Sequence, residues 1–193
     1  MLNKKLCVLT SNRHKFEEIS EVAREFNIEL DLCDGFKLEF QADTLEEIVT
    51  KSAMLAYIYL KRPLLVEDAG LFVEALNGFP GPYSNYVYRT IGINGLLKLL
   101  DNVSNRRACF KSAVALIHEG GVFISSGEVC GTISQCPRGS RGFGFDPVFI
   151  PDGETRTFAE MSISEKNRYS HRAKAVRKAL ALLLGGKTTT THL

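Results

Sequence analysis

Two long strand-like segments, residues 108–118 and 121–135, are separated only by the turn Glu119-Gly120-Gly121. Strands joined by so short a connection run in opposite directions, so this part of the chain predicts an antiparallel β-hairpin. Segments with the apolar spacing of helices flank the hairpin on both sides. The combination predicts an α/β or α+β chain with a mixed sheet and covering helices.

Before the hairpin, the apolar pattern predicts that strands and helices alternate. The predicted elements are a strand at 5–10, a helix from about 16 to 26, a strand at 29–33, a helix at 45–60 and a compact buried strand at 64–66. Thr44, with Glu47 three residues later, has the pattern of a capping box at the start of the second helix. The strand at 64–66 is expected to end in Glu67 and Asp68.

The remainder of the chain is richer in turns. Residues 77–82 cannot continue a regular element, and a short helix is expected near 94–100. A strand at 148–150 precedes a last helix, which is expected to start at Ser170 and to stop at the glycines 185–186. The side chains that this helix is expected to bury are Ala173, Val176, Leu180, Leu183 and Leu184.

The composition is that of an ordinary soluble domain. A chain of 193 residues corresponds to about one domain, so we expect a single domain over 1–186 and a disordered tail at 187–193. A net charge of +2 requires no polyanionic partner, and the apolar runs are shorter than the roughly 18–20 residues of a membrane span. The five cysteines are scattered and contain no C-x-x-C pair. We therefore expect buried thiols, neither zinc nor disulfides, and a cytoplasmic protein with no nucleic-acid or membrane partner.

The junction of the first strand and first helix has the components of a phosphate-binding loop. Its residues are Thr10, Ser11, Asn12, Arg13, His14 and Lys15. A helix N-terminus presents unpaired N–H groups and the positive end of the helix dipole, which together favour anions. An ordinary N-cap with a surface lysine is the alternative interpretation.

Carboxylates after the third strand indicate a magnesium site. Glu67 and Asp68 are followed by the small residues Ala69 and Gly70, and Glu39 is flanked by apolar residues on another loop. Magnesium takes carboxylate oxygens together with water and substrate phosphates. The alternatives are a simple strand-end turn for the first pair and a surface position for Glu39.

A glycine-rich loop, Gly142-Phe143-Gly144-Phe145-Asp146-Pro147, could recognise a nucleobase. Either aromatic ring can stack on a base, and Asp146 can accept hydrogen bonds from a base edge. The alternative is that both rings fill a core beneath the loop.

A basic cluster surrounds the start of the last helix. Lys166 precedes it, and Ser170 as N-cap places His171 and Arg172 in its first turn. The helix dipole disfavours cations there. We therefore expect a local negative partner, such as a bound anion or a base carbonyl. A solvated basic face is the alternative.

These clusters, in this order, resemble the inosine/xanthosine triphosphate pyrophosphatase family. The motifs that carry the resemblance are Thr-Ser-Asn-x-x-Lys, Glu-Asp-x-Gly-Leu, Gly-Phe-Pro-Gly-Pro-Tyr-Ser, Gly-Phe-Gly-Phe-Asp-Pro and Glu-Lys-Asn-x-x-Ser-His-Arg. The likeness extends from Thr10 to about Leu184. No single motif is diagnostic, whereas their common order is specific.

The resemblance implies an enzyme that uses Mg²⁺ to hydrolyse ITP, dITP and XTP to the monophosphate and pyrophosphate. It also implies an elongated mixed sheet, two lobes around a central nucleotide cleft, and a homodimer. By resemblance, Glu39 and Asp68 hold the metal, and Asp68 is also the proton acceptor. The implied substrate-binding residues are Thr10 to Lys15, Ala69, Phe143, Gly144, Phe145, Asp146, Lys166, His171 and Arg172.

Three positions depart from the family pattern. Ala69 replaces a common serine, Phe145 replaces a common tyrosine or tryptophan, and His14 stands where glycine is frequent. These changes remove two possible substrate hydrogen bonds and crowd the phosphate loop. They leave the metal-binding pair and the basic pocket in place.

The resulting hypothesis is that Asp68, alone or together with Glu67, accepts a proton from water that attacks the α-phosphorus. Lys15 and the first helix then hold the departing pyrophosphate, while Lys166, His171 and Arg172 donate to a 6-oxo group of the base. Two alternatives remain: a Maf-like enzyme for pyrimidine triphosphates, and a non-catalytic nucleotide- or RNA-binding module. Three tyrosines in the turn-rich middle could form an interface or pack in the core: Tyr83, Tyr86 and Tyr88.

Overall fold

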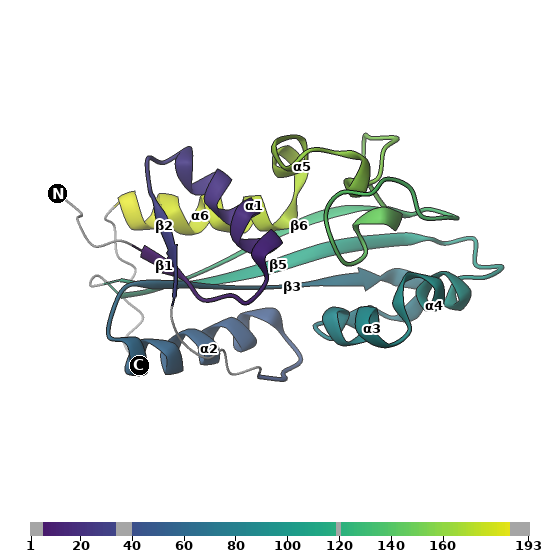
Figure 1. Ribbon diagram of the computed structural model, residues 1–193. Helices are drawn as coiled ribbons and strands as arrows, with labels where there is room; N and C mark the ends of the chain where they lie inside the picture. Colours follow the sequence, from purple (N-terminus) through teal and green to yellow (C-terminus); the bar gives the residue numbers. More distant parts are fainter. Residues whose placement is uncertain (1–5, 34–39, 119–120, 186–193) are drawn as a thin grey trace.

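The computed structural model describes residues 6–33, 40–118 and 121–185 (Figure 1). Its strands are β1 (Leu6–Val8), β2 (Leu30–Leu32), β3 (Leu64–Val73), β4 (Pro80–Gly81), β5 (Arg107–His118), β6 (Gly121–Ile133) and β7 (Phe149–Pro151). Its α-helices are α1 (Arg13–Arg24), α2 (Leu45–Leu60), α3 (Ser84–Thr90), α4 (Gly92–Leu99), α5 (Ile163–Tyr169) and α6 (His171–Gly185). Short 3₁₀ helices lie at Glu74–Leu76, Asp146–Val148 and Phe158–Glu160. Among the described residues, no helix has both the length and the apolar character needed to cross a bilayer.

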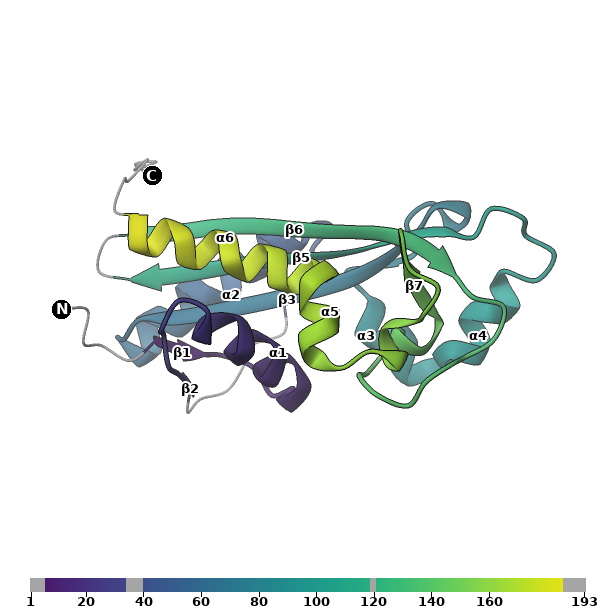
Figure 2. The ribbon, with the colours of Figure 1, turned by 90° about the horizontal axis from the view of Figure 1, so that it is seen from above.

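The strands form one mixed sheet in the order β2-β1-β3-β5-β6-β7, and β4 pairs with the edge of β3. β1 is parallel to β2 and β3, whereas the other pairs are antiparallel. The β5–β6 hairpin runs in register from Arg107 opposite Thr132 to His118 opposite Gly121. The predicted mixed sheet and the antiparallel pairing of the two long strands are confirmed. Figure 2 shows the elongated form that these long strands produce.

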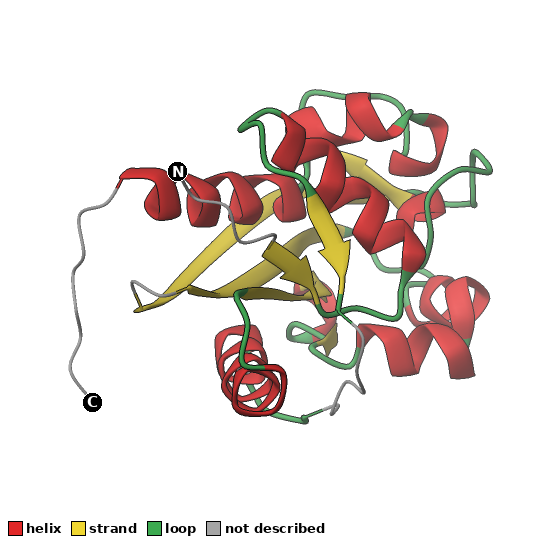
Figure 3. Cartoon of the chain, turned by 60° about the vertical axis from the view of Figure 1, so that its left-hand side comes forward, coloured by secondary structure: helices red, strands yellow, loops and turns green. Residues whose placement is uncertain are grey.

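Helices cover both faces of the sheet, with α1 and α6 on one face and α2 on the other (Figures 1 and 3). Successive side chains of a strand point to opposite faces, so β3 divides its apolar residues between two layers. Leu65 packs in the cluster with α1 and α6, whereas Leu64 and Val66 pack in the cluster with α2. A third cluster, centred on residues such as Phe110 and Phe149, joins α3 and α4 to the other end of the sheet.

One edge of β3 is interrupted. β1 ends its pairing with β3 where Val8 lies opposite Leu65, and β4 begins where Gly81 lies opposite Leu71. Within the described ranges, no strand pairs with residues 66–70 on this side. A break of this kind lets a ligand approach a central strand.

β3 is longer than the sequence predicted. The expected end at Glu67 and Asp68 is wrong, because the strand continues to Val73 and these residues pair with Val114 and Ala113 of β5. The antiparallel partner supplies backbone hydrogen bonds on one side of β3. The backbone of Glu67 and Asp68 is therefore satisfied within the strand, and their carboxylates are compensated by cations from other elements.

The segment after β3 folds back against it. The Ser84 hydroxyl donates to the Gly81 carbonyl at 2.7 Å and accepts from the Leu71 N–H at 2.7 Å. A Cβ atom on Gly70 would lie 2.2 Å from the Gly81 carbonyl oxygen, so this crossing requires glycine. These contacts hold α3, which the sequence analysis did not predict, beside the open edge of β3.

Helix boundaries lie near the predicted ones. α1, α2 and α6 begin at the side-chain caps Asn12, Thr44 and Ser170. The expectation that α6 buries Leu183 and Leu184 holds only in part, because Leu183 packs at the margin of the core and Leu184 is 49% exposed in the last turn. The predicted tail 187–193 lies outside the described residues.

The prediction that disulfides are absent is wrong. Cys7 is bonded to Cys33 and Cys109 to Cys130, which leaves Cys136 as an exposed free thiol. Cys109 and Cys130 lie directly opposite one another in β5 and β6, and Cys33 follows β2 beside β1. Spacing along the chain does not reveal such pairs, because strand register decides which cysteines meet.

Candidate active site

A cavity of about 610 Å³ lies at the open edge of β3 and is lined from both faces of the sheet. The predicted site residues that line it are Thr10, Ser11, Asn12, Arg13, Lys15, Asp68, Ala69, Phe143, Gly144, Phe145, Asp146, Lys166, His171 and Arg172. The structure therefore brings all four sequence clusters to one place. The predicted residue His14 lies beside the cavity, against Phe143, and Glu39 falls outside the described residues.

The start of α1 is capped by its own sequence. Asn12 Oδ1 accepts from the backbone N–H groups of His14 at 3.0 Å and Lys15 at 3.3 Å. Thr10 Oγ1 accepts from the Asn12 N–H at 3.1 Å. Two of the amides expected to hold phosphate thus already have a partner. The Asn12 cap fixes the conformation of the loop. Lys15 is the cation of this loop that contacts β3.

Lys15 reaches both carboxylates of β3. Its Nζ lies 3.1 Å from Glu67 Oε2 and 3.2 Å from Asp68 Oδ1. Neighbouring residues in a strand point to opposite faces, and a cation at the strand edge can contact both. Burial alone would lower the pKa of Lys15, but the charges of Glu67 and Asp68 outweigh burial and raise this pKa. Lys15 is therefore a fixed cation.

The two carboxylates have different surroundings. Glu67 is 2% exposed, and its Oε1 accepts from Ser112 Oγ at 2.6 Å and lies 3.1 Å from Arg172 Nε. Burial would raise the pKa of Glu67, but Arg172, Lys15 and the Ser112 hydrogen bond hold it far below its ordinary value. Asp68 is half-buried and lines the cavity, whereas Glu67 does not. Only Asp68 is placed to meet a ligand.

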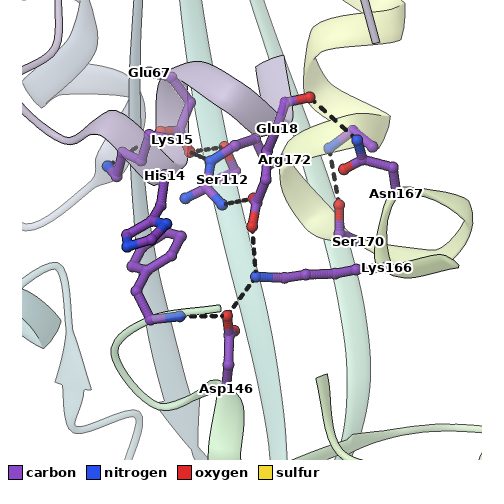
Figure 4. A network of polar contacts seen from close by, with 12 residues as sticks. His14, Lys15, Glu18, Glu67, Ser112, Asp146, Lys166, Asn167, Ser170 and Arg172 are labelled. Atoms are coloured by element: carbon purple, nitrogen blue, oxygen red, sulfur yellow. Dashed lines mark hydrogen bonds and ion pairs between the residues drawn. The ribbon is translucent and has the colours of Figure 1, made fainter. Parts of the chain in front are cut away.

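A buried ion network joins Lys166 and Arg172, which were predicted to recognise the base (Figure 4). Lys166 Nζ lies 2.6 Å from Asp146 Oδ2 and 2.7 Å from Glu18 Oε1. Arg172 Nη1 lies 2.5 Å from Glu18 Oε2. Burial would lower the pKa of Lys166 and of Arg172, but the buried carboxylates raise both.

The compensating charge at the start of α6 comes from the protein. The sequence analysis expected a bound anion or base carbonyl there, whereas Glu18 and Glu67 neutralise Arg172. Glu18 was missed. The sequence offers one indication of its position: Glu18 lies three residues after Lys15, so the two share one side of the helix, next to its apolar face. Local spacing does not show that its partners lie in α5 and α6.

The surroundings of His171 favour the neutral form of its ring. Its ring stacks on Phe110 with centroids 4.7 Å apart and planes 9° apart. Burial and the neighbouring charges of Arg172 and Lys166 lower the pKa of His171 well below its ordinary value. Its buried Nδ1 has no hydrogen-bond partner within the described part of the chain. His171 lines the cavity, so a ligand can provide that partner.

The glycine-rich loop presents one aromatic ring and buries the other. Phe143 is half-buried, with Lys166 Nζ 5.0 Å and Arg172 Cζ 5.4 Å from its ring centroid, and His14 stacks on it at 5.6 Å. Phe145 is 2% exposed and meets Tyr88 edge-on at 5.6 Å. Phe143 is thus the better placed ring for a base, while Phe145 belongs mainly to the core.

Asp146, predicted as an acceptor for a base edge, also has contacts within the protein. Its Oδ2 already accepts from the Phe143 N–H at 2.9 Å and from Lys166. A Cβ on Gly142 would lie 2.2 Å from the same oxygen, which explains the glycine at φ +70°. Burial, aided by Glu18, raises the pKa of Asp146 although Lys166 opposes this. Asp146 shapes the loop and holds Lys166.

The opposite wall contains residues that sequence reasoning did not assign to the site. From α2 and α3 these include Ile48, Ser52, Tyr83, Asn85, Tyr86, Tyr88 and Arg89. The tyrosines, for which an interface and the core were both considered, line this cavity and are too exposed to belong to the core. The motif Gly-Phe-Pro-Gly-Pro-Tyr-Ser was the available signal, because it builds the turn that carries α3.

The donor set near Asp68 fits a hard divalent cation. Its carboxylate opens to the cavity, and among the described residues its hydrogen-bond partner is Lys15, on Oδ1. A magnesium ion usually takes one or two carboxylates together with substrate phosphates and water. A separate group of possible ligands, Cys109, Glu128 and Cys130, has its two sulfurs joined in a disulfide.

Known proteins resemble this chain over most of its length. A model of the Ham1 family matches residues 6–182. The chain is 56% identical to the dITP/XTP pyrophosphatase of Hyperthermus butylicus over 90% of this chain and 91% of that protein. It is 54% identical to the dITP/XTP pyrophosphatase of Saccharolobus solfataricus, again over 90% and 91% of the two chains.

Solved structures have the same architecture. The Staphylococcus aureus Ham1 protein superposes with a TM-score of 0.79 at 28% identity, covering 95% of this chain and 100% of that one. A HAM1 protein from Coxiella burnetii gives a TM-score of 0.79 at 29% identity, covering 94% and 98%. The mixed sheet with flanking helices is thus shared with these proteins.

Proposed function

Because the chain belongs to the Ham1 family, we propose that it hydrolyses the deaminated purine triphosphates ITP, dITP and XTP to the monophosphate and pyrophosphate. Relatives 44–56% identical over most of the chain are named dITP/XTP pyrophosphatases. The observation that carries the proposal is the cavity itself. It joins a capped helix N-terminus, one accessible carboxylate and a buried cation cluster beside an aromatic ring. Neither the Maf-like enzyme nor the binding module is favoured.

Asp68 is proposed as the proton acceptor. The attacking water forms a bond to the α-phosphorus, and the bond from that phosphorus to the bridging oxygen breaks. Pyrophosphate leaves with the electron pair, and Asp68 accepts the proton of the water. Glu67 is buried and held by Ser112, Arg172 and Lys15, so it positions these cations and takes no proton.

Magnesium is proposed as the cofactor. When bound, it supplies positive charge to the phosphate oxygens. Asp68 would hold it, with Glu39 as the second carboxylate by resemblance. Lys15, already placed beside Asp68, would attract the same phosphates and orient them towards the carboxylate.

Base selection is proposed to rest on the cluster of Lys166, His171 and Arg172. Lys166 and Arg172 are fixed cations, and the Nδ1 of neutral His171 lacks a partner. A 6-oxo group accepts hydrogen bonds from such a cluster. The 6-amino group of adenine is itself a donor, so it would place its N–H groups against the N–H groups of the cations. A site that hydrogen-bonds one group can reject its analogue by about 10⁴–10⁵-fold. Phe143 would stack on the base.

We further propose a homodimer located in the cytoplasm. Exposed apolar side chains of α2, namely Met54, Leu55 and Ile58, support a protein contact. Disulfides are rare in reducing compartments, with intracellular proteins of hyperthermophiles as an exception, so the two bridges do not themselves support this location. Light scattering of the purified protein tests the dimer.

The first test is a product assay. The purified protein is incubated with ITP, XTP, GTP or ATP and magnesium, and pyrophosphate and orthophosphate are measured separately. Pyrophosphate from ITP and XTP, abolished by a chelator, is the expected result. Orthophosphate would move the cleavage to the terminal phosphate, and equal turnover of ATP would contradict the proposed base selection.

A further inference from the structure

Arg89 differs from the other cations that line the cavity. Arg13 pairs with Glu17, and Lys15 with Glu67 and Asp68. Lys166 and Arg172 pair with buried carboxylates as described above. Within the part of the chain that the structure describes, Arg89 has no carboxylate partner, although it lies in the same cavity wall. Among the described residues, it is the lining cation whose charge no carboxylate compensates.

The fold holds Arg89 on the wall opposite the phosphate loop. Lys15 belongs to α1, above the sheet in Figure 1, and Arg89 belongs to α3, below it. The cavity between them lies at the unpaired edge of β3. The Ser84 hydrogen bonds and the close crossing of Gly70 and Gly81 anchor the first turn of α3 to β3. The helix that carries Arg89 is thus fixed relative to Asp68.

The charges of the substrate decide which part an unpaired arginine would bind. A nucleoside triphosphate carries its negative charge on the phosphates, and the ribose is neutral. Most of the positive charge of Lys15, Lys166 and Arg172 is already balanced by Glu18, Glu67, Asp68 and Asp146. An arginine with free N–H groups can contact phosphate oxygens in a bidentate manner.

We infer that Arg89 is a substrate-binding residue that contacts the polyphosphate from the side opposite Lys15. This inference rests on the proposed function, because it assigns a further contact within that site. The two cations would hold the polyphosphate between them, across the edge of β3 and over Asp68. Tyr83 and Tyr86 are exposed on the same wall, so their hydroxyl groups would add further hydrogen-bonding groups beside the polyphosphate.

The test compares Arg89→Gln with Arg24→Gln. Arg24 is the matched control, since it is also an exposed arginine in the last turn of a helix and lies outside the cavity wall. For ITP hydrolysis, Arg89→Gln is expected to raise KM about 10- to 100-fold, with kcat changed much less, and Arg89→Lys to restore part of the loss. Arg24→Gln is expected to behave as wild type.

Product inhibition identifies the part of the substrate involved. Arg89→Gln is expected to raise the inhibition constant of pyrophosphate by the same factor as the KM for ITP. The inhibition constant of inosine monophosphate should stay nearly unchanged. Equal weakening by both products, or no difference from Arg24→Gln, would overturn the inference. Circular dichroism and thermal melting of each variant establish that the fold is retained, which separates binding from misfolding.

Calorimetric titration of inorganic pyrophosphate with magnesium separates this inference from the proposed function. Binding that Arg89→Gln weakens supports the inference even if the wild-type protein releases no pyrophosphate from ITP, in which case the proposed function alone fails. Turnover of ITP together with pyrophosphate binding that is insensitive to Arg89→Gln leaves the function intact and rejects the inference. No binding and no turnover by the wild type would reject both.

Discussion

Glu18 Oε1 lies 2.7 Å from Lys166 Nζ, although 148 residues separate the two along the chain. The other oxygen of Glu18 accepts from Arg172. One buried carboxylate of α1 therefore holds two cations of the proposed base-recognition cluster. Since α1 also begins with the proposed phosphate loop, one helix connects the two proposed ends of the site.

Removing this carboxylate charge is expected to destabilise the protein strongly. Glu18→Gln leaves Lys166 and Arg172 buried with less compensation, and breaking a buried pair in this way costs about 3–5 kcal/mol. Urea denaturation measures the loss in the free energy of unfolding. Glu25→Gln, which breaks the exposed pair with Arg177, is the control and should cost less than about 1 kcal/mol. Equal losses in the two variants would show that burial of Glu18 has no special effect.

Asp68 and Glu67 should respond differently to loss of charge. Asp68→Asn is expected to lower kcat by about 10²–10⁴-fold at saturating magnesium, with little change in stability, because this carboxylate faces the cavity. Glu67→Gln is expected to lower the free energy of unfolding by about 3–5 kcal/mol, because Lys15 and Arg172 lose a buried partner. Steady-state kinetics and denaturation of both variants check this. Normal turnover by Asp68→Asn would exclude it as the base.

His171 should make stability depend on pH below 6.5. Burial, with the charges of Arg172 and Lys166, holds its pKa well below the ordinary 6.5. The unfolded chain then takes up a proton below pH 6.5 that the folded chain does not, so the free energy of unfolding falls as pH drops. The slope approaches about 1.4 kcal/mol per pH unit. Denaturation curves at several pH values should show a shallower slope for His171→Asn, with His118→Asn as the control. An unchanged slope would contradict the assignment.

The disulfides can be counted directly. Alkylation of the denatured, unreduced protein should modify Cys136 alone, and alkylation after reduction should modify all five cysteines. The Cys7–Cys33 bridge closes a loop with a sequence separation of 26. Replacing both with serine is expected to lower the free energy of unfolding by about 3 kcal/mol in the absence of reductant. Five alkylated thiols without reduction would contradict both bridges.

Much of the local structure could be predicted from the sequence. Apolar spacing located α1, α2 and α6, because a helix that packs on a sheet must bury one stripe of side chains. The alternation of strand and turn residues located the β5–β6 hairpin. The order of the short motifs also identified the family and the residues that line one side of the cavity, but not those of α2 and α3.

The sequence by itself determined most of the elements, the caps of the long helices and the residue types available to the site. The tertiary structure alone decided how those residues are paired. It placed Glu18 between Lys166 and Arg172, committed Asp146 to the loop, joined the cysteines and turned α3 with Arg89 towards the cavity. The physical reason is one of range: a cap or an apolar stripe depends on neighbours within a few residues. Buried charges and cysteines find their partners through strand register and the packing of layers, which no local spacing encodes.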